Sequence, residues 1–422
     1  MNLVPLKDIT LAVPRQVSGP YTRLRTLLGV GLTGLFFALP WLRWEDAPLL
    51  WLDSAGGQLH LAGVRFWPED LGLLAGVLLV AAFGLFWVTV LAGRVWCGYA
   101  CPQTVWAALF TACARIAQGR RPVKHLLWLA LSALTAFTLV ALFIPGPVLW
   151  GQLLSGTPGT AIWAWLTGLT LATYGNAGWF RSKLCVYVCP YGRFQSVMFD
   201  PHTPVVTYHS ARGEPRGRYR AGQSGAGQGD CVACTLCVQV CPTGIDIRQG
   251  LQIGCIACGA CVDACNGVMA KLHRPMGLIA YGQQGLEHGG LRPRLIGYGL
   301  VLLGCMAMLG HGVANRPLLA LTVSKDRQLY RLLGEGAVEN VFTLTLKNKD
   351  RHPHTYTLAV TGPHELAWQG ANQLRLAPYE QRTQVIRLAL PAAHAARHAL
   401  VFQASSKEDV VNVDSQFTGP PP

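Results

Sequence analysis

Charged side chains are scarce in this chain of 422 residues. Asp, Glu, Lys and Arg make up 13% of it, whereas 51% of the residues are hydrophobic. A soluble protein of this size carries about 25% charged residues. The scarcity therefore argues against a soluble protein and predicts several membrane spans. Acidic residues are rarer than basic ones, with 21 Asp and Glu against 35 Lys and Arg. In a membrane protein such an excess of bases fills the cytoplasmic loops, so we expect no nucleic-acid partner.

Two further absences limit the reactions that the chain could catalyse and the bonds that its cysteines could form. No serine–histidine or paired-carboxylate arrangement stands out, so hydrolysis has no support. None of the fourteen cysteines follows Cys305. Cys113 and Cys305 stand alone in apolar surroundings, which is typical of small buried hydrophobic residues. The other twelve fall into four motifs, and we expect metal sites there rather than disulfides.

Five stretches are apolar and long enough to cross the roughly 30 Å hydrocarbon layer. They are residues 24–42, 71–93, 125–144, 160–180 and 295–314. The stretch 103–118 is too short to cross, so we expect it to lie in the interface or to re-enter. These spans predict a multi-pass membrane protein in contact with membrane lipid.

The charges of the loops alternate along the chain. The N-terminal arm, the loop 94–124 and the segment 181–294 are rich in Lys and Arg, whereas five of the seven charged residues in the loop 43–70 are acidic. The loop 145–159 is uncharged. Because basic loops stay in the cytoplasm, this pattern predicts a cytoplasmic N-terminus, a cytoplasmic segment 181–294 and a periplasmic C-terminal domain.

Eight cysteines form two runs with the same spacing. The runs are Cys231-x2-Cys234-x2-Cys237-x3-Cys241-Pro242 and Cys255-x2-Cys258-x2-Cys261-x3-Cys265. This is the spacing by which bacterial-type ferredoxins hold two 4Fe–4S clusters, with the fourth cysteine of each run crossing to the other cluster. One cluster is then held by Cys231, Cys234, Cys237 and Cys265, and the other by Cys255, Cys258, Cys261 and Cys241.

Zinc is the alternative, because four thiolates also suit that ion. Zinc sites usually separate two cysteine pairs by a long loop, whereas here four cysteines crowd into eleven residues, twice. The spacing therefore favours iron–sulfur clusters and an electron-transfer function.

A second repeat lies in the membrane part. Cys97-x3-Cys101-Pro102 follows the second predicted span, and Cys185-x3-Cys189-Pro190 follows the fourth. We call these the twin motifs. On a helix, positions i and i+4 share one face, so each pair could present two sulfurs to a common point. The four thiolates would suit Cu(I), zinc or a further iron–sulfur centre, and we expect a metal site at Cys97, Cys101, Cys185 and Cys189.

The chain divides into five predicted regions. Residues 1–206 form an α-helical membrane domain with the twin motifs, 207–230 a basic linker near anionic headgroups, and 231–275 an α+β insert that holds two clusters. Residues 276–316 contain a linker and the last span. Residues 317–422 form an all-β domain of immunoglobulin type, because short alternating strands recur there at 341–347, 355–361, 383–390 and 398–403.

The histidines of this last domain show no ligand spacing, so solvated loop histidines are favoured over a metal site. They are His352, His354, His364, His394 and His398.

Taken together, these features resemble the cytochrome c oxidase accessory proteins called CcoG, FixG or RdxA. The resemblance includes Pro14-Arg-Gln-Val-Ser-Gly19, the ending Cys261-Val-Asp-Ala-Cys265-Asn-Gly-Val-Met269 and Ser415-Gln-Phe-Thr-Gly-Pro420. The cysteine motifs alone also occur in the NapH-like membrane ferredoxins of nitrate respiration, which lack the C-terminal sandwich.

The resemblance implies a role in building a cbb3-type cytochrome c oxidase, in which an oxidoreductase reduces Cu(II) to Cu(I) for the copper centre. It implies a bacterial inner membrane as the location, with the C-terminal domain in the periplasm. It also implies a cytoplasmic electron donor, two 4Fe–4S clusters, copper at the twin motifs, and oxidase subunits or copper chaperones as partners. Two other functions stay open: a NapH-like quinol or ferredoxin electron conduit without copper, and a non-catalytic assembly scaffold.

Overall fold

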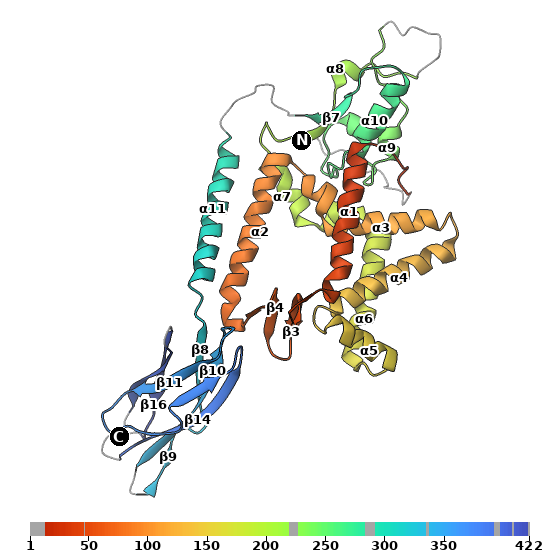
Figure 1. Cartoon of the computed structure of the whole chain (residues 1–422). Helices are drawn as coiled ribbons and strands as arrows, with labels where there is room; N and C mark the ends of the chain where they lie inside the picture. Colours follow the sequence, from red (N-terminus) through yellow and green to blue (C-terminus); the bar gives the residue numbers. More distant parts are fainter. Residues whose placement is uncertain are drawn as a thin grey trace. The chain divides into compact units, whose positions relative to one another are not determined.

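The computed structural model describes residues 13–45, 47–218, 227–282, 292–334, 337–391, 397–406 and 409–420. The chain divides into two compact units, Met1–Leu309 and Gly310–Pro422. The first unit contains the helices and the cysteine motifs, and the second contains the all-β domain (Figure 1).

Long helices make up most of the first unit. They are α1 (Pro20–Ala38), α2 (Leu71–Ala92), α3 (Pro102–Ile116), α4 (Arg121–Val140), α5 (Gly146–Ser155), α6 (Thr160–Thr173), α7 (Pro190–Met198) and α11 (Pro293–Ala314). Several start signals are local. Pro lies at the first or second position of α1, α3, α4, α5 and α7, where its missing N–H costs no hydrogen bond.

Four helices are long and apolar enough to cross a membrane: Pro20–Trp41, Pro68–Ala92, Arg121–Val140 and Pro293–Ala314. They correspond to four of the five predicted spans. The remaining stretch, 160–180, consists of α6 followed by a π-helix, Tyr174–Phe180, and is not among the four. Five crossings and the sides on which the loops lie therefore stay predictions. The stretch 103–118 forms most of α3, a helix of 15 residues.

Helices α2 and α11 lie side by side in Figure 1, and small residues allow their close contact. A Cβ added at Gly76 would lie 3.0 Å from Leu309 Cδ1, and one added at Gly299 would lie 3.1 Å from Trp87 Nε1. Glycine thus brings two apolar helices together by van der Waals packing, as is common in membranes.

The predicted acidic loop contains short strands: β1 (Arg43–Trp44), β2 (Ala47–Pro48), β3 (Leu50–Asp53), β4 (Gln58–Leu61) and β5 (Val64–Phe66). β3, β4 and β5 form an antiparallel sheet in that order. Asp53 accepts hydrogen bonds from the N–H groups of Ala55 and Gly56 and so closes the β3–β4 turn. Strands of two to four residues are too short for a periodic pattern to reveal.

The cysteine-rich segment is closed by an antiparallel pair, β6 (Val205–Tyr208) and β7 (Ile279–Gly282). Between them lie α8 (Ser210–Gly213), α9 (Leu236–Gln239), a 3-10 helix at Ile247–Gln249, and α10 (Ala260–Lys271). The ordered segment therefore begins at Val205 and is wider than the predicted 231–275.

The predicted linker 207–230 needs correction. Its first residues belong to β6 and α8, and Arg212 Nε lies 2.6 Å from the Asp230 carboxylate in an ion pair. Residues 219–226 lie outside the described residues. The basic and glycine-rich composition concealed a strand whose partner begins only at Ile279.

The second unit is an antiparallel sandwich, as predicted. One sheet has the order β12-β14-β10-β8, with β9 also paired to β10, and the other has the order β13-β11-β15-β16. The strands are β8 (Leu319–Lys325), β9 (Arg331–Leu332), β10 (Val338–Asn348), β11 (His354–Thr361), β12 (Ala367–Gln369), β13 (Gln373–Leu376), β14 (Gln381–Leu390), β15 (His398–Ser405) and β16 (Val410–Phe417).

Alternation along the strands builds the core of the sandwich. Phe342, Leu344 and Leu346 of β10 are buried, and the Phe342 ring centroid lies 5.1 Å from that of Phe402 on β15. Since every second residue of a strand points to the same face, this sequence pattern alone predicts which side chains fill the core.

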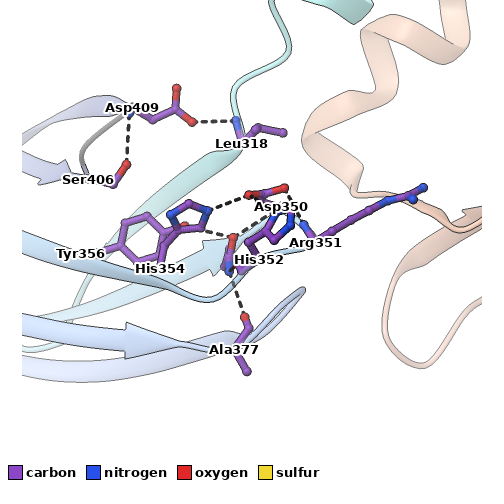
Figure 2. Close-up of polar contacts among 10 residues, drawn as sticks. Leu318, Asp350, Arg351, His352, His354, Tyr356, Ala377, Ser406 and Asp409 are labelled. Carbon is purple, nitrogen blue, oxygen red and sulfur yellow. Dashed lines mark hydrogen bonds and ion pairs between the residues drawn. The ribbon is translucent and has the colours of Figure 1, made fainter.

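A hydrogen-bonded turn joins β10 to β11 (Figure 2). Asn348, fully buried, donates to the carbonyl groups of His352 and Ala377 and accepts from the N–H of Asp350 and the Tyr356 hydroxyl.

Two of the histidines considered for metal binding belong to the same turn. Asp350 lies 2.7 Å from His354 Nε2 and 3.4 Å from His352 Nδ1. These two histidines therefore hydrogen-bond within the turn, and His394 lies outside the described residues.

Candidate iron–sulfur site and its thiol neighbours

The two cysteine runs have the same backbone as well as the same spacing. Ala233 and Thr235 in the first run have φ of 51° and 57°, and Ala257 and Gly259 at the equivalent positions of the second have φ of 49° and 71°. α9 and α10 start at the next residue in each run. These left-handed residues turn each loop sharply before the helix, so that successive cysteines can surround one cavity.

Two small cavities lie inside the segment, and each is lined by one predicted quartet. The first is lined by Cys231, Cys234, Cys237 and Cys265. The second is lined by Cys241, Cys255, Cys258 and Cys261, with Cys237 also on its wall. The structure thus brings together the cysteines that the crossed assignment pairs, including the two that come from the opposite run.

Electrostatic interactions between the thiols agree with this grouping. Burial raises the pKa of Cys265 to about 12, and the charges of Cys237, Cys231 and Cys234 contribute in the same direction. Burial also raises the pKa of Cys261, with contributions from Cys258, Cys255 and Cys241. Buried thiols as basic as these stay protonated unless a metal centre takes the place of the proton.

The surroundings suit anionic iron–sulfur clusters. The N–H groups of Ala257, Ala260 and Ile279 donate to Cys255, Cys258 and Cys265 respectively. Hydrogen bonds to the sulfurs tune such clusters. Among the described residues, no group of three or more Cys, His, Asp or Glu side chains converges as the ligands of a single ion.

The twin motifs also share one local structure. Trp96–Ala100 and Leu184–Val188 are π-helical, and the N–H of each second cysteine bonds five residues back, Cys101 to Trp96 O at 2.8 Å and Cys189 to Leu184 O at 2.9 Å. Proline then starts a new helix. The expectation that each pair shares one face of an α-helix was therefore wrong, because the second cysteine lies at the junction of two helices. π-Helical turns are frequent at functional sites.

The fold brings the two motifs together. Burial raises the pKa of Cys97 to about 12, and the neighbouring thiols Cys101, Cys185 and Cys189 add to the shift. A reciprocal amide pair supports this approach: Gln103 on α3 and Asn176 each donate to the other at 2.9 Å. The four thiols form a group, which the described geometry does not make a single-ion site.

The first twin motif packs directly on the loop of the second cysteine run. A Cβ added at Gly98 would lie 2.8 Å from Ile256 O and 2.9 Å from Ala257 O. Only glycine allows this approach, so no side chain separates the Cys97 backbone region from the loop that carries Cys255 and Cys258.

Arg94 also connects the first twin motif to the loop of the second cysteine run. The sequence analysis did not identify this role. Only 6% of it is exposed. Its Nη1 donates to the carbonyl groups of Ile253 and Cys255, and its Nη2 donates to Gly192 O at 3.0 Å. Its charge also acts on Cys97 and Cys255. The available signal was its place directly before a cysteine motif, but the sequence analysis used it only as one of the basic residues of the loop 94–124.

Asp263, between the last two cysteines of the second run, anchors the start of α1. Its carboxylate accepts from the N–H and the hydroxyl of Thr22, both at 2.7 Å, and Asp263 is buried. A carboxylate at a helix N-terminus is favourable because it accepts from free N–H groups. The first helix is thereby fixed to the cysteine-rich segment.

Comparison with known proteins adds independent evidence. A family model described as a 4Fe-4S dicluster domain matches residues 180–284, and a model described as a 4Fe-4S binding domain matches residues 74–121. A third, for the IG-like fold at the C-terminal of FixG, matches residues 309–420.

Similarity to curated relatives covers most of the chain. It is 36% identical to the protein RdxA of Cereibacter sphaeroides over 420 residues, which span 90% of this chain and 88% of the relative. The chain belongs to the FixG/RdxA family. It is 33% identical to the nitrogen fixation protein FixG of Rhizobium meliloti, over 83% of this chain and 79% of that one. The expected resemblance is confirmed, and the C-terminal sandwich separates the chain from NapH-like ferredoxins.

A solved structure is also similar: the crystal structure of a FixG-related protein from Vibrio parahaemolyticus, at 25% identity and a TM-score of 0.23, over 25% of this chain and 98% of that one.

This membership makes the chain an iron–sulfur electron-transfer protein of FixG/RdxA type, with several helices that can cross a membrane and an immunoglobulin-like C-terminal domain. The dicluster match includes all eight cysteines of the two runs and also Cys185 and Cys189, while the shorter match includes Cys97 and Cys101. The dicluster match supports two 4Fe–4S clusters. The comparisons give copper no support, and the roles of individual cysteines stay predictions.

Proposed function

We propose that this protein passes single electrons from its two clusters to the thiols of the twin motifs, where they reduce Cu(II) to Cu(I) for the copper centre of a cbb3-type cytochrome c oxidase. The observation that carries this proposal is the direct packing of the first twin motif on the Cys255 loop, with Gly98 against Ile256 O and Arg94 bonded to Cys255 O.

The chemistry balances with one electron for each copper ion. When bound, the clusters supply low-potential one-electron transfer. One electron converts Cu(II) to Cu(I), and no bond to carbon forms or breaks. Thiolates prefer the softer cuprous ion, so Cys97, Cys101, Cys185 and Cys189 would hold the product better than the substrate. The chain's own part is to keep the four thiols together and beside the loop of one cluster.

The proposed electron transfer takes place on the cytoplasmic side, where the loop 94–124 and the segment 181–294 are expected. A cytoplasmic donor reduces the clusters, and the C-terminal sandwich meets oxidase subunits or copper chaperones on the periplasmic side. The alternation of charge along the loops supports these sides. Opposite sides for the two ends require an odd number of crossings, so 160–180 would be the fifth. Reporter fusions after Gln118, Thr157 and Phe417 test this arrangement: we expect cytoplasmic, periplasmic and periplasmic signals.

Replacing all four twin-motif cysteines with serine tests the reaction. Anaerobically purified protein is reduced with dithionite, freed of excess reductant and mixed with Cu(II) and a Cu(I)-specific chelator. We expect the variant to lose most cupric reduction, while the electron paramagnetic resonance signals of both clusters remain. Cys113→Ser is the matched control, because Cys113 packs beside Phe110 and Trp128. Unchanged reduction and copper binding in the four-serine variant would rule the proposal out.

A second candidate is a further iron–sulfur centre at the twin motifs, with the protein acting as an electron conduit. The 4Fe-4S family match over residues 74–121, which includes Cys97 and Cys101, favours it. Metal analysis separates the two candidates. About eight irons per chain, together with binding of added copper, would support the copper site, whereas about twelve irons per chain would support a third iron–sulfur centre. The four-serine variant should lose copper in one case and four irons in the other.

A further inference from the structure

A large cavity lies between the membrane helices and the cysteine-rich segment. Its volume is about 760 Å³. The walls come from the residues before α1, from α1 and α3, from Phe180–Cys185 and from the loops at 240–243 and 256–260. Cys185 of one twin motif and Cys258 of the second run are both on its wall. The proposed function does not use this cavity.

Five cations line it, and no Asp or Glu does among its described lining residues. The cations are Arg15, Arg25, Arg115, Arg181 and Lys183. Within the part of the chain that the structure describes, no carboxylate forms an ion pair with any of the five. In a chain with a net charge of +14 some bases lack partners, but five around one cavity create a strongly positive interior.

Three of these cations are held by neutral groups. Arg115 Nη2 donates to Pro14 O at 2.9 Å, and Arg15 Nη1 donates to Gln239 Oε1. Arg181 donates to Gly178 O, and its guanidinium lies 5.1 Å from the ring centroid of Trp128. These contacts orient the cations without pairing them with a carboxylate.

Arg25 and Arg115 lie close enough to repel each other. Burial lowers the pKa of Arg115, and the charge of Arg25 lowers it further. Arg25 also shares the wall of this cavity with Cys258. Two neighbouring guanidinium groups without an acid are a typical arrangement for holding a phosphate.

The rest of the wall is mostly apolar or small, with Gln16, Tyr99 and Gln103 as its larger polar residues. On α1 the lining residues run from Thr22 and Arg25 to Gly29 and Val30, one turn further into the span, and on α3 they include Ala107 and Ala108. A positive region next to an apolar surface, at the end of membrane helices, matches an amphiphile with an anionic head.

We propose that this cavity binds the phosphate of an anionic phospholipid, held by Arg25 and Arg115, with its acyl chains along α1 and α3. The headgroup then fills the space between the twin motifs and the Cys258 loop and neutralises the two arginines. Because Arg25 and Cys258 line the same cavity, the bound phosphate makes the surroundings of that cluster less positive.

Lipid retention tests the site on the full chain, purified in a neutral detergent. Bound phospholipid is extracted and quantified by mass spectrometry, and purified chains stripped of lipid are titrated with phosphatidylglycerol or phosphatidylcholine in detergent. We expect the native chain to retain phosphatidylglycerol and Arg25→Gln/Arg115→Gln to retain roughly thirtyfold less, since each basic residue contributes about fivefold to such binding. Arg25→Lys/Arg115→Lys, which keeps both charges, should retain most of it.

Arg120→Gln/Arg121→Gln is the matched control, because it removes two exposed cations at the start of α4 that do not line the cavity. Equal losses in both double variants would mean adsorption to a basic surface and would overturn the proposal. Inorganic phosphate that binds as tightly as the lipid would assign the site to free phosphate, and a stoichiometric quinone that survives Arg25→Gln/Arg115→Gln would assign it to a neutral ligand.

A second measurement uses the cluster. In nanodiscs, adding phosphatidylglycerol to phosphatidylcholine should shift the midpoint potential of one cluster downward in the native chain and leave it unchanged in Arg25→Gln/Arg115→Gln. A variant that does not fold loses its clusters altogether, which iron analysis detects. The same lipid-dependent shift in the variant would contradict the proposed phosphate contact.

Discussion

The cysteine-rich segment and the C-terminal sandwich differ in the side chains that fill their interiors. The sandwich buries a continuous apolar core that includes Phe342, Phe402 and Leu388, and it contains no cysteine. The cysteine-rich segment spans fewer than eighty residues between β6 and β7, and thiols such as Cys237 and Cys255 belong to its hydrophobic clusters.

The difference shows what holds each region together. Two sheets of apolar side chains fold by excluding water. A small segment with thiols in its interior depends on the metal centres that bind them, because it buries too little apolar surface otherwise. Iron removal should therefore affect the two regions unequally.

The largest effect is expected for a cluster ligand. Cys261→Ala should remove one cluster, which is about half of roughly eight irons per chain, and should open the segment 205–282 to protease while the sandwich stays resistant. Iron analysis and limited proteolysis measure both. Cys305→Ala, in α11, is the control. Full iron content in Cys261→Ala would contradict the assignment of this ligand.

The complementary change is in the sandwich. Phe402→Ala should destabilise it by about 3–5 kcal/mol, because a fully buried ring leaves a cavity. Hydrogen exchange of the β strands in the full chain should increase, with iron content unchanged. Val410→Ala, on an exposed position of β16, should have little effect. If Phe402→Ala also released iron, the two cores would not be independent.

Arg94→Gln tests the junction between the clusters and the twin motifs. It removes charged hydrogen bonds to Cys255 O and Gly192 O, and we expect a loss of roughly 2–3 kcal/mol in the stability of the segment. The midpoint potential of one cluster should also fall, because a cation stabilises the more negative reduced form. Redox titration measures this, with Lys183→Gln as the counterpart before the second motif. Equal shifts in the two variants would remove the special role of Arg94.

The smallest effect concerns the turn in Figure 2. Burial would raise the pKa of Asp350, but hydrogen bonds from His354 and the Arg351 N–H and the charge of His352 outweigh it and lower that pKa. The stability this gives is present above the unfolded pKa of about 3.9 and is lost as the pH falls through the lower folded value.

Asp350→Asn should therefore cost about 1 kcal/mol at neutral pH and flatten the loss of stability of the sandwich in acid. Unfolding of the sandwich at several pH values, followed by hydrogen exchange, measures both effects. Asp414→Asn, exposed on β16, is the control. If the sandwich of Asp350→Asn lost stability in acid as steeply as the native one, another group would be the cause of that loss.

Spacing and alternation made much of the molecule predictable. The eight cysteines that line two cavities follow from a repeated local pattern, and the core face of β10 follows from its period of two. The pairing of β6 with β7 and the burial of Arg94 could not be predicted, because each depends on residues far away in the chain. The twin motifs illustrate both cases: their repetition was visible, but the π-helical turns that displace Cys101 and Cys189 were not.

The sequence by itself determined the thiol groups, the apolar helices and the strands of the sandwich, because covalent spacing and side-chain periodicity are properties of short segments. Only the tertiary structure decided that Gly98 lies against the Cys255 loop, that Arg94 is a buried junction and that five cations surround one cavity. Contacts of this kind form between segments that no local pattern connects, and their energies depend on burial that exists only in the folded chain.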